Sequence, residues 1–340
     1  MNENIIGLIC VFGIYFFFII YGIVQEKIHA LGNKSIGDRF NYSIFLVFCF
    51  CLVNTFVSFS VVEFNNWRVC SGELRNSKRG NNRELSKNKK TNIFGFSSDC
   101  LLQILLTSIS YVSAMVLTNL ALGKVNYPTQ ILVKSAKCVP IIVVGALYFK
   151  TKYPWYDYLT VVVITISLSC FNMMQIKTNK AGTVQTLSGV VLLGASLICD
   201  GLTGPRQDKL IKRYNVPSNI LMFYTNLFAT ILCGVLSIIF EGYQPYYFIS
   251  RFPSTPYYIL ALSLTGTCGQ FFIFQSLTRF GSLYLAIITT TRKFFTVLIS
   301  VVLFGHQLTF GQWLCVIATF IALGIQTIFS RKAKEKIKKI

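Results

Sequence analysis

The sequence predicts an all-α integral membrane protein with ten transmembrane helices, arranged as two inverted five-helix repeats. Three observations carry this prediction. Of the 340 residues, 53% are hydrophobic and 13% are charged, with a mean hydropathy of +0.57, whereas about 25% charged residues is usual in soluble proteins. Apolar runs long enough to cross a bilayer recur along the whole chain. Part of the first half also matches part of the second half at a constant offset.

Each predicted span has about 18 or more mostly apolar residues, which is the length that a helix needs to cross the hydrocarbon core. The ten spans lie at about residues 5–24, 43–62, 99–121, 125–149, 154–175, 186–203, 218–240, 255–277, 282–304 and 309–329. The first run is preceded by neither a basic region nor a small-residue cleavage site, so we expect a retained helix and not a signal peptide.

The lysines and arginines behind the net charge of +20 lie mostly in the segments between the predicted spans. With a cytosolic N-terminus, 21 of the 32 lysines and arginines fall in cytosolic segments, seven in lumenal segments and four inside spans. This asymmetry is the positive-inside pattern, so both termini are expected in the cytosol. The same pattern explains the basic composition without a nucleic-acid partner.

The repeat divides the chain into three expected parts. Residues 1–175 form a first five-helix repeat that includes a disordered cytosolic loop at 63–98, residues 186–329 form the second repeat, and 330–340 form a basic cytosolic tail. A shift of 156 residues places spans four and five on spans nine and ten without a gap, with Lys137 on Lys293. Five spans per repeat is an odd number, so the second copy must be inverted, as in many secondary transporters.

Four cationic side chains fall inside predicted spans at equivalent places in the two repeats: Lys134, Lys137, Arg292 and Lys293. Each costs about 2.5–3.5 kcal/mol near the bilayer centre, so the four together cost roughly 10–14 kcal/mol. A chain keeps such groups where something anionic or polar meets them. The alternative to a ligand is pairing with the few carboxylates in the spans, such as Asp200, which leaves excess positive charge.

The residue types around these cations suit a phosphate. Lys134 and Lys137 are three residues apart and share a face of the expected helix, so a phosphate would relieve their repulsion. Arginine binds phosphate through two hydrogen bonds, whereas lysine acts as a point charge. Polar neighbours that could hydrogen-bond the same ligand are Tyr127, Gln130 and Thr291.

The sequence allows two alternative roles for each of two further residues. Glu26 is a candidate to balance the cations in an empty cavity, and the alternative is an ordinary acid at the membrane interface beside Lys27. Gln270 follows a stretch of small residues, so its amide either binds the ligand or packs between close helices. No catalytic set, metal cluster or cofactor motif is found, so we expect no enzyme activity, no metal site and no cofactor.

Four stretches of the chain resemble the nucleotide-sugar transporters of solute carrier family 35, within its B branch related to the endoplasmic-reticulum UDP-galactose transporter. The stretches are Asn126-Tyr127-Pro128-Thr129-Gln130, Lys134-Ser135-Ala136-Lys137-Cys138-Val139-Pro140, Asp200-Gly201-Leu202-Thr203-Gly204 and Ile288-Thr289-Thr290-Thr291-Arg292-Lys293-Phe294-Phe295.

This resemblance implies a drug/metabolite-transporter fold with alternating access. It also implies exchange of a cytosolic nucleotide sugar, UDP-galactose or UDP-glucose, for a lumenal nucleotide, with the phosphates held at Lys134, Lys137 and Lys293. Relatives in the same branch are proposed ATP/ADP exchangers, so that substrate pair remains an alternative. A carrier of another phosphorylated metabolite and a non-transporting receptor or scaffold are further alternatives.

The C-terminal tail predicts the location. Lys336 and Lys338 stand fifth and third from the end of the chain, as in the retrieval signal that coat machinery reads on endoplasmic-reticulum membrane proteins. An ordinary basic tail is the alternative. The expected partners are therefore an anionic nucleotide or nucleotide sugar, membrane lipid and this coat machinery.

Overall fold

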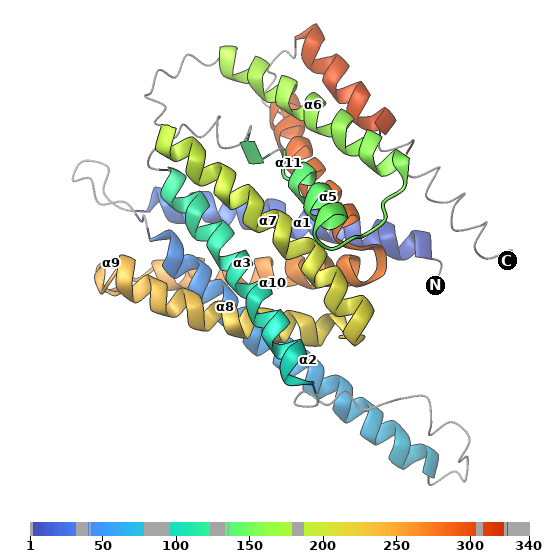
Figure 1. Cartoon of the computed structure of the whole chain (residues 1–340). Helices are drawn as coiled ribbons and strands as arrows, with labels where there is room; N and C mark the ends of the chain where they lie inside the picture. Colours follow the sequence, from blue (N-terminus) through green and yellow to red (C-terminus); the bar gives the residue numbers. More distant parts are fainter. Residues whose placement is uncertain are drawn as a thin grey trace, which may run out of the picture. The chain divides into compact units, whose positions relative to one another are not determined.

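The computed structural model describes residues 3–31, 40, 42–77, 96–122, 133–134, 136–178, 187–303, 309–322 and 325, and the regular secondary structure among them is helical (Figure 1). The labelled helices are α1 (Glu3–Ala30), α2 (Ser43–Ser77), α3 (Ser98–Leu122), α5 (Cys138–Leu147), α6 (Trp155–Thr178), α7 (Leu187–Tyr214), α8 (Ser218–Phe240), α9 (Gln244–Arg251), α10 (Thr255–Phe280) and α11 (Ser282–Leu303). A further helix covers Phe310–Ala322.

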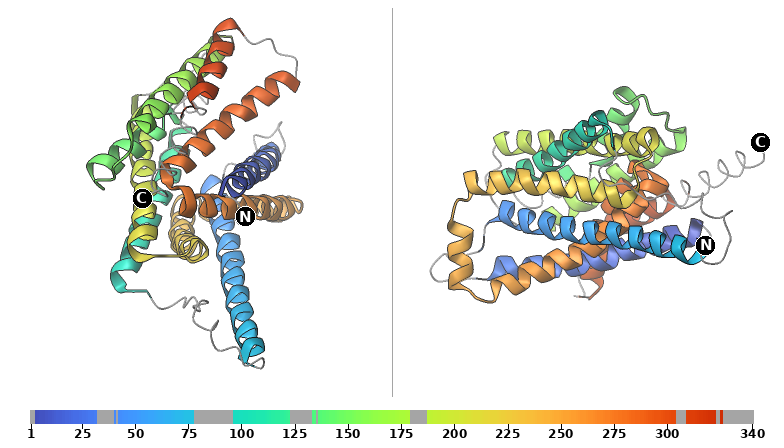
Figure 2. Two further views of the ribbon diagram at one scale, coloured as in Figure 1. Left: turned by 90° about the vertical axis from the view of Figure 1, so that its right-hand side faces the viewer. Right: turned by 90° about the horizontal axis from the view of Figure 1, so that it is seen from below.

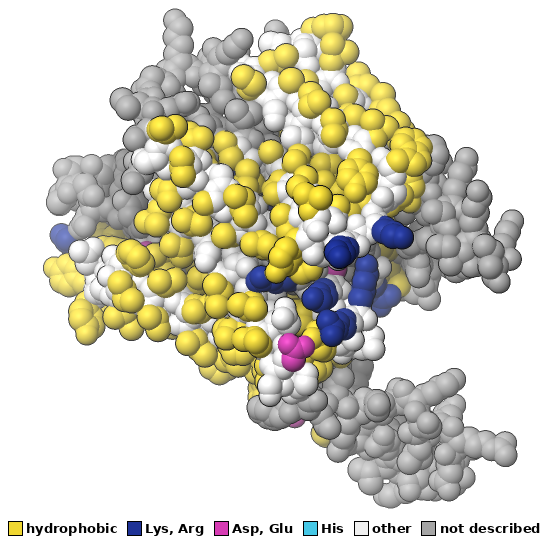
Figure 3. All heavy atoms as spheres, in the orientation of Figure 1, with side chains coloured by type: hydrophobic (Ala, Val, Ile, Leu, Met, Phe, Trp, Pro, Cys, Tyr) yellow, Lys and Arg dark blue, Asp and Glu magenta, His cyan; other side chains and the backbone are white. Residues whose placement is uncertain are grey.

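Six of the described helices are long and apolar enough to cross a membrane: α1, α2, α3, α7, α8 and α10. The predicted fourth, fifth, ninth and tenth spans overlap α5, α6, α11 and the helix Phe310–Ala322 within the described residues. Hydrophobic side chains cover most of the described surface on the face drawn in Figure 3. The chain is thus an all-helical, multi-pass membrane protein.

The expected loop at 63–98 is wrong in its first part, because α2 continues to Ser77. Once a helix exists, each added residue gains a hydrogen bond, so a polar segment can extend it. The short helix α9 was not predicted. Its Phe248 is buried, whereas Tyr246 and Tyr247 are exposed.

The contacts divide the chain into two compact units, and both units draw on both halves of the sequence. One unit comprises Met1–Ile109 and Leu210–Arg279, and the other comprises Ser110–Lys209 and Phe280–Ile340.

In the first unit α2 and α8 lie side by side (Figures 1 and 2). Small residues on α10 allow equally close packing, because a Cβ at Gly266 would overlap the ring of Phe50, and one at Gly269 would overlap that of Phe18. The glycines before Gln270 thus serve close packing with aromatic rings.

A carboxylate caps the start of α2 by accepting hydrogen bonds from its first turn. Glu241, directly after α8, accepts hydrogen bonds from the backbone N–H groups of Ile44 (2.8 Å) and Phe45 (2.7 Å) through its two oxygens. These donors belong to the first turn of α2, where a helix leaves N–H groups unpaired and favours negative charge. Glu241 thus has a structural role at the start of α2.

The second unit has an apolar core built by α5, α6, α11 and the helix Phe310–Ala322. Its buried side chains include Ile141 of α5, Phe171 of α6, Ile287 of α11 and Val316. Arg292 and Lys293 lie in α11, and the turn with Lys134 and Lys137 leads directly into α5, so this core positions the candidate site.

Candidate anion-binding site

Lys134 and Lys137 lie at a helix break, and not within one continuous helix as the sequence predicted. The backbone N–H of Lys137 reaches the carbonyl of Lys134 (3.4 Å), and that of Val139 reaches Ala136 (2.9 Å). These bonds join residues three apart, as in a 3₁₀ turn, so Lys134 and Lys137 still share a side of the chain. Helix α5 begins only at Cys138, with Lys137 as its N-terminal cap residue.

Pro140 explains where α5 begins. It has no N–H to donate to the carbonyl of Ala136, and proline is tolerated in the first turn of a helix but not further in. The break leaves the start of α5 directly after Lys137. Because a helix N-terminus carries partial positive charge, the lysine and the helix end favour an anion at the same place.

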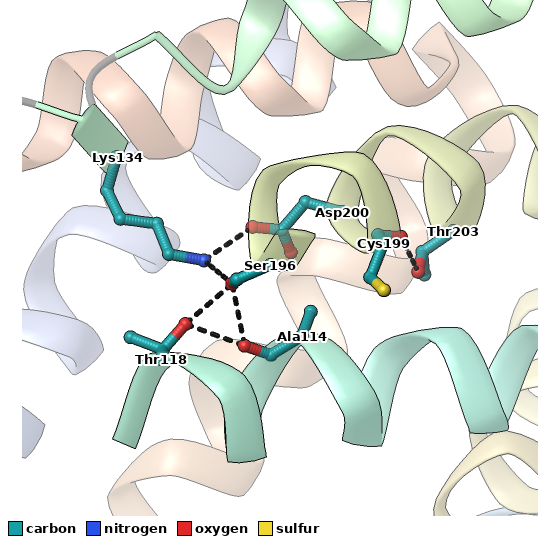
Figure 4. A network of polar contacts seen from close by, with 7 residues as sticks. All are labelled: Ala114, Thr118, Lys134, Ser196, Cys199, Asp200 and Thr203. Atoms are coloured by element: carbon teal, nitrogen blue, oxygen red, sulfur yellow. Dashed lines mark hydrogen bonds and ion pairs between the residues drawn. The ribbon is translucent and has the colours of Figure 1, made fainter. Parts of the chain in front are cut away.

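Lys134 has an anionic partner inside the protein. Its ammonium forms an ion pair with Asp200 Oδ2 at 2.8 Å and donates a second hydrogen bond to the hydroxyl of Ser196 (Figure 4). The side chains are 12% and 26% exposed for Lys134 and Asp200. Asp200 lies in α7, near the middle of a membrane-spanning helix. The pair therefore cancels one of the four positive charges predicted within the spans.

The Ser196 hydroxyl is held in place from α3. Ser196 donates to the carbonyl of Ala114 (2.8 Å), and Thr118 donates to the same carbonyl (2.6 Å). Each hydroxyl has a single hydrogen, so these two bonds leave the lone pairs of Ser196 to accept from Lys134. The network orients Lys134 toward α7 (Figure 4).

Helix α7 approaches the starts of both α5 and α11 through its small residues. A Cβ at Gly201 would lie 3.0 Å from the backbone carbon and oxygen of Pro140, and one at Gly204 would lie 3.0 Å from Cβ of Ser282. Asp208 then accepts hydrogen bonds from the N–H (2.9 Å) and hydroxyl of Ser282, which caps α11. Small residues at such positions allow close helix packing in membranes.

We expect Gly201→Ala to weaken anion binding and to lower the free energy of unfolding by about 1–3 kcal/mol, as overpacking does. The new methyl group would push against the backbone of Pro140 and so shift the first turn of α5. Gly194→Ala is the matched control on the same helix, because a Cβ there meets nothing within 4 Å. Thermal unfolding with and without nucleotide measures both effects, and equal behaviour of the two variants would contradict the assigned packing.

The other two cations come from α11, which contacts α5 in the same unit. Cys138 Sγ lies 3.6 Å from Thr290 Oγ1, so the residue after Lys137 touches the middle of α11. Arg292 follows two residues later and is partly buried, whereas Lys293 lies in α11 with its side chain outside the described residues. The contact thus brings the lysine-bearing turn close to the segment that carries Arg292.

The remaining predicted residues have different positions. Thr291 is buried, and its hydroxyl donates to the carbonyl groups of Ile287 and Ile288 in its own helix. Gln270 belongs to the first unit, where its Oε1 accepts a hydrogen bond from Asn54. Glu26 lies in α1 of that unit, and its side chain is outside the described part. The rest of the set falls outside the described residues: Tyr127, Gln130, Lys336 and Lys338.

Sequence reasoning did not single out Ser196 and did not specify the partner of Lys134. A serine at position 196 resembles any small residue in a membrane helix, so no local signal distinguished it. Asp200 did give a signal, since it is a carboxylate within an apolar helix. Its pairing with Lys134 required the three-dimensional structure.

Comparison with known proteins decides the family. The model of the UAA transporter family matches residues 6–330. The chain belongs to the UAA transporter family. Solute carrier family 35 member B1 of Xenopus tropicalis is 34% identical over 96% of this chain and 95% of its own length. The Bos taurus protein of the same name is 35% identical over 96% and 94%, and that of Dictyostelium discoideum is 32% identical over 99% and 80%.

This UAA transporter family member also resembles a solved crystal structure, with a TM-score of 0.66 over 98% of this chain and 99% of that chain. The two sequences are 11% identical, so the similarity concerns the fold alone. The resemblance to solute carrier family 35 found in the sequence is confirmed. The family and the names of the relatives indicate a transporter and not an enzyme.

Proposed function

We propose that this protein is a nucleotide-sugar antiporter that moves UDP-galactose or UDP-glucose into the endoplasmic reticulum in exchange for a nucleotide. The observation that carries the proposal is the contact between α5 and α11 at Cys138 and Thr290. It joins the turn that bears Lys134 and Lys137 to the segment that bears Arg292, all within one compact unit. Relatives named solute carrier family 35 member B1 support a carrier of solutes, and the motifs described in the sequence favour nucleotide sugars.

In this proposal the phosphates bind between the start of α5 and the middle of α11. Lys137 and Lys293 act as point charges, Arg292 forms paired hydrogen bonds, and Lys134 contributes from the turn. Ten helices in two inverted repeats would place these groups at the repeat interface near the membrane centre, where secondary transporters bind their substrates. Binding of the anion would stabilise the closed state and allow the carrier to reorient.

A second candidate is an ATP/ADP exchanger of the same membrane, and the net charge of the site keeps it open. The four cations together with Asp200 carry a net charge of +3. The magnitude of this charge lies between those of a UDP-sugar, which carries about −2, and of ATP, which carries about −4. Charge balance therefore permits either substrate. Whether the site prefers uracil or adenine must be tested directly.

The orientation and location follow from the charges outside the spans. The excess of lysine and arginine in alternate segments supports cytosolic termini. A cytosolic tail is where a retrieval signal at Lys336 and Lys338 would be read by coat machinery. Lysine-to-serine substitution at both positions should release a tagged protein from the endoplasmic reticulum if the tail is the signal.

Thermal unfolding with added ligand tests the function. We expect UDP-galactose, UDP-glucose and UMP to stabilise the purified protein, by about 2.7 kcal/mol when a ligand is present at 100 times its Kd. Uridine, which lacks the phosphate, is the matched control and should stabilise far less. Stabilisation by ATP and ADP alone would replace the proposal by the exchanger, and no stabilisation by any nucleotide would favour a receptor or scaffold.

A further inference from the structure

Asp200 has a different kind of partner from two other carboxylates of the described chain. Asp208, two turns further along α7, uses both of its oxygens to hold Ser282 at the start of α11. Glu241 likewise uses both oxygens, at the start of α2. Among the described residues, Asp200 accepts through Oδ2, and its partner is the cation Lys134. Asp208 and Glu241 thus cap helix ends, whereas Asp200 neutralises a residue of the candidate site.

The cation in this pair has a donor that no described residue uses. An ammonium group has three N–H donors. Within the described part of the chain, Lys134 uses one for Asp200 and one for Ser196. No described group accepts from the third donor, so an incoming oxygen atom can contact Lys134 before the ion pair breaks. At 26% exposure, Asp200 has room to move away from Lys134.

We infer that Asp200 is an internal counterion, which holds Lys134 in the empty transporter and which a phosphate group of the substrate displaces. This inference rests on the proposed function, because it assumes that Lys134 binds phosphate. Asp200 is then a positioning residue and contacts the substrate only through Lys134. A carboxylate and a phosphate compete for the same donors, so the apparent affinity is lowered by the fraction of molecules in which Lys134 is paired.

Replacement of this counterion should increase the affinity for nucleotides, whereas most substitutions near a binding site lower it. We expect Asp200→Asn to bind UDP and ADP about tenfold more tightly than the wild type, because the amide no longer competes for Lys134. The affinity for uridine and adenosine should not change, because they lack phosphate. In the Lys134→Gln background, Asp200→Asn should tighten the binding of UDP and ADP by much less than tenfold, because no ammonium is released and only the repulsion between carboxylate and phosphate is removed. A purely structural ion pair predicts instead that its loss weakens binding or leaves it unchanged.

The matched control is Asp208→Asn, the same substitution on the same helix. It removes a cap on α11 but no partner of Lys134, so it should lower thermal stability without tightening nucleotide binding. Binding is measured by titration of each purified variant with UDP, ADP and the two nucleosides.

A structure of the wild-type protein with bound UDP or ADP keeps the inference testable if Asp200→Asn does not fold. We expect Lys134 Nζ to contact a phosphate oxygen and to lie more than 4 Å from Asp200 Oδ2. An ion pair that stays intact in that complex, or weaker or equal binding by Asp200→Asn, would overturn the inference alone. Failure of the wild type to bind any nucleotide would overturn the proposed function together with it.

Discussion

Lys137→Ala is expected to abolish most nucleotide-sugar exchange while the protein stays folded. Among the described residues the Lys137 side chain forms no ion pair, and as the cap residue of α5 it makes no capping hydrogen bond. Its backbone is already helical, with φ −60° and ψ −23°, so alanine fits without strain. Within the described part of the chain, the charge of Lys137 is therefore not paired with a carboxylate and is available to a ligand.

The size of this effect follows from the kind of bond that is lost. A hydrogen bond to a charged group contributes about 1.5–3 kcal/mol, which corresponds to a loss of affinity of roughly 10- to 150-fold. Uptake of labelled UDP-sugar into proteoliposomes preloaded with nucleotide measures it. Lys212→Ala, an exposed cation in the last turn of α7, is the control and should exchange normally. Full exchange by Lys137→Ala would show that the phosphate binds elsewhere.

The membrane-spanning pattern and the positions of most helices could be predicted from the sequence, because long apolar runs have few alternatives to helices in a bilayer. The described helices α8 and α10 begin at the predicted residues, and α8 also ends there. Helix ends in polar segments were less accurate. The extension of α2 to Ser77 depends on a helix that is already formed, which local composition does not reveal.

The cations of the candidate site could be predicted from the sequence, but the ion pair between Lys134 and Asp200 could not. Buried cations stand out in a sequence because their cost in hydrocarbon is large, and so Lys134 and Lys137 could be identified. The break between them depends on Pro140 and on the approach of Gly201, which lie far apart in the sequence. The ion pair with Asp200 joins residues 66 positions apart. Such contacts are set by helix packing, which the periodicity of one segment does not encode.

Lys134→Ala is expected to behave in the opposite way to Lys137→Ala and to destabilise the fold itself. It removes the partner of Asp200 and leaves a carboxylate without a counterion in the middle of α7. Breaking a buried ion pair from one side costs about 3–5 kcal/mol. Because Asp200 is 26% exposed, we expect a value near the lower limit, about 3 kcal/mol. Equilibrium unfolding in detergent measures this loss.

The double variant Lys134→Met/Asp200→Leu separates charge from packing. Replacement of both partners by apolar residues removes the unpaired carboxylate, and such replacements are often neutral or stabilising, so the free energy of unfolding should return to within about 1 kcal/mol of the wild type. Nucleotide binding should remain weak, because the phosphate has lost Lys134. Wild-type stability in Lys134→Ala would mean that water already solvates Asp200. In that case the ion pair would contribute little to the fold, and the position of Lys134 would depend on Ser196 alone.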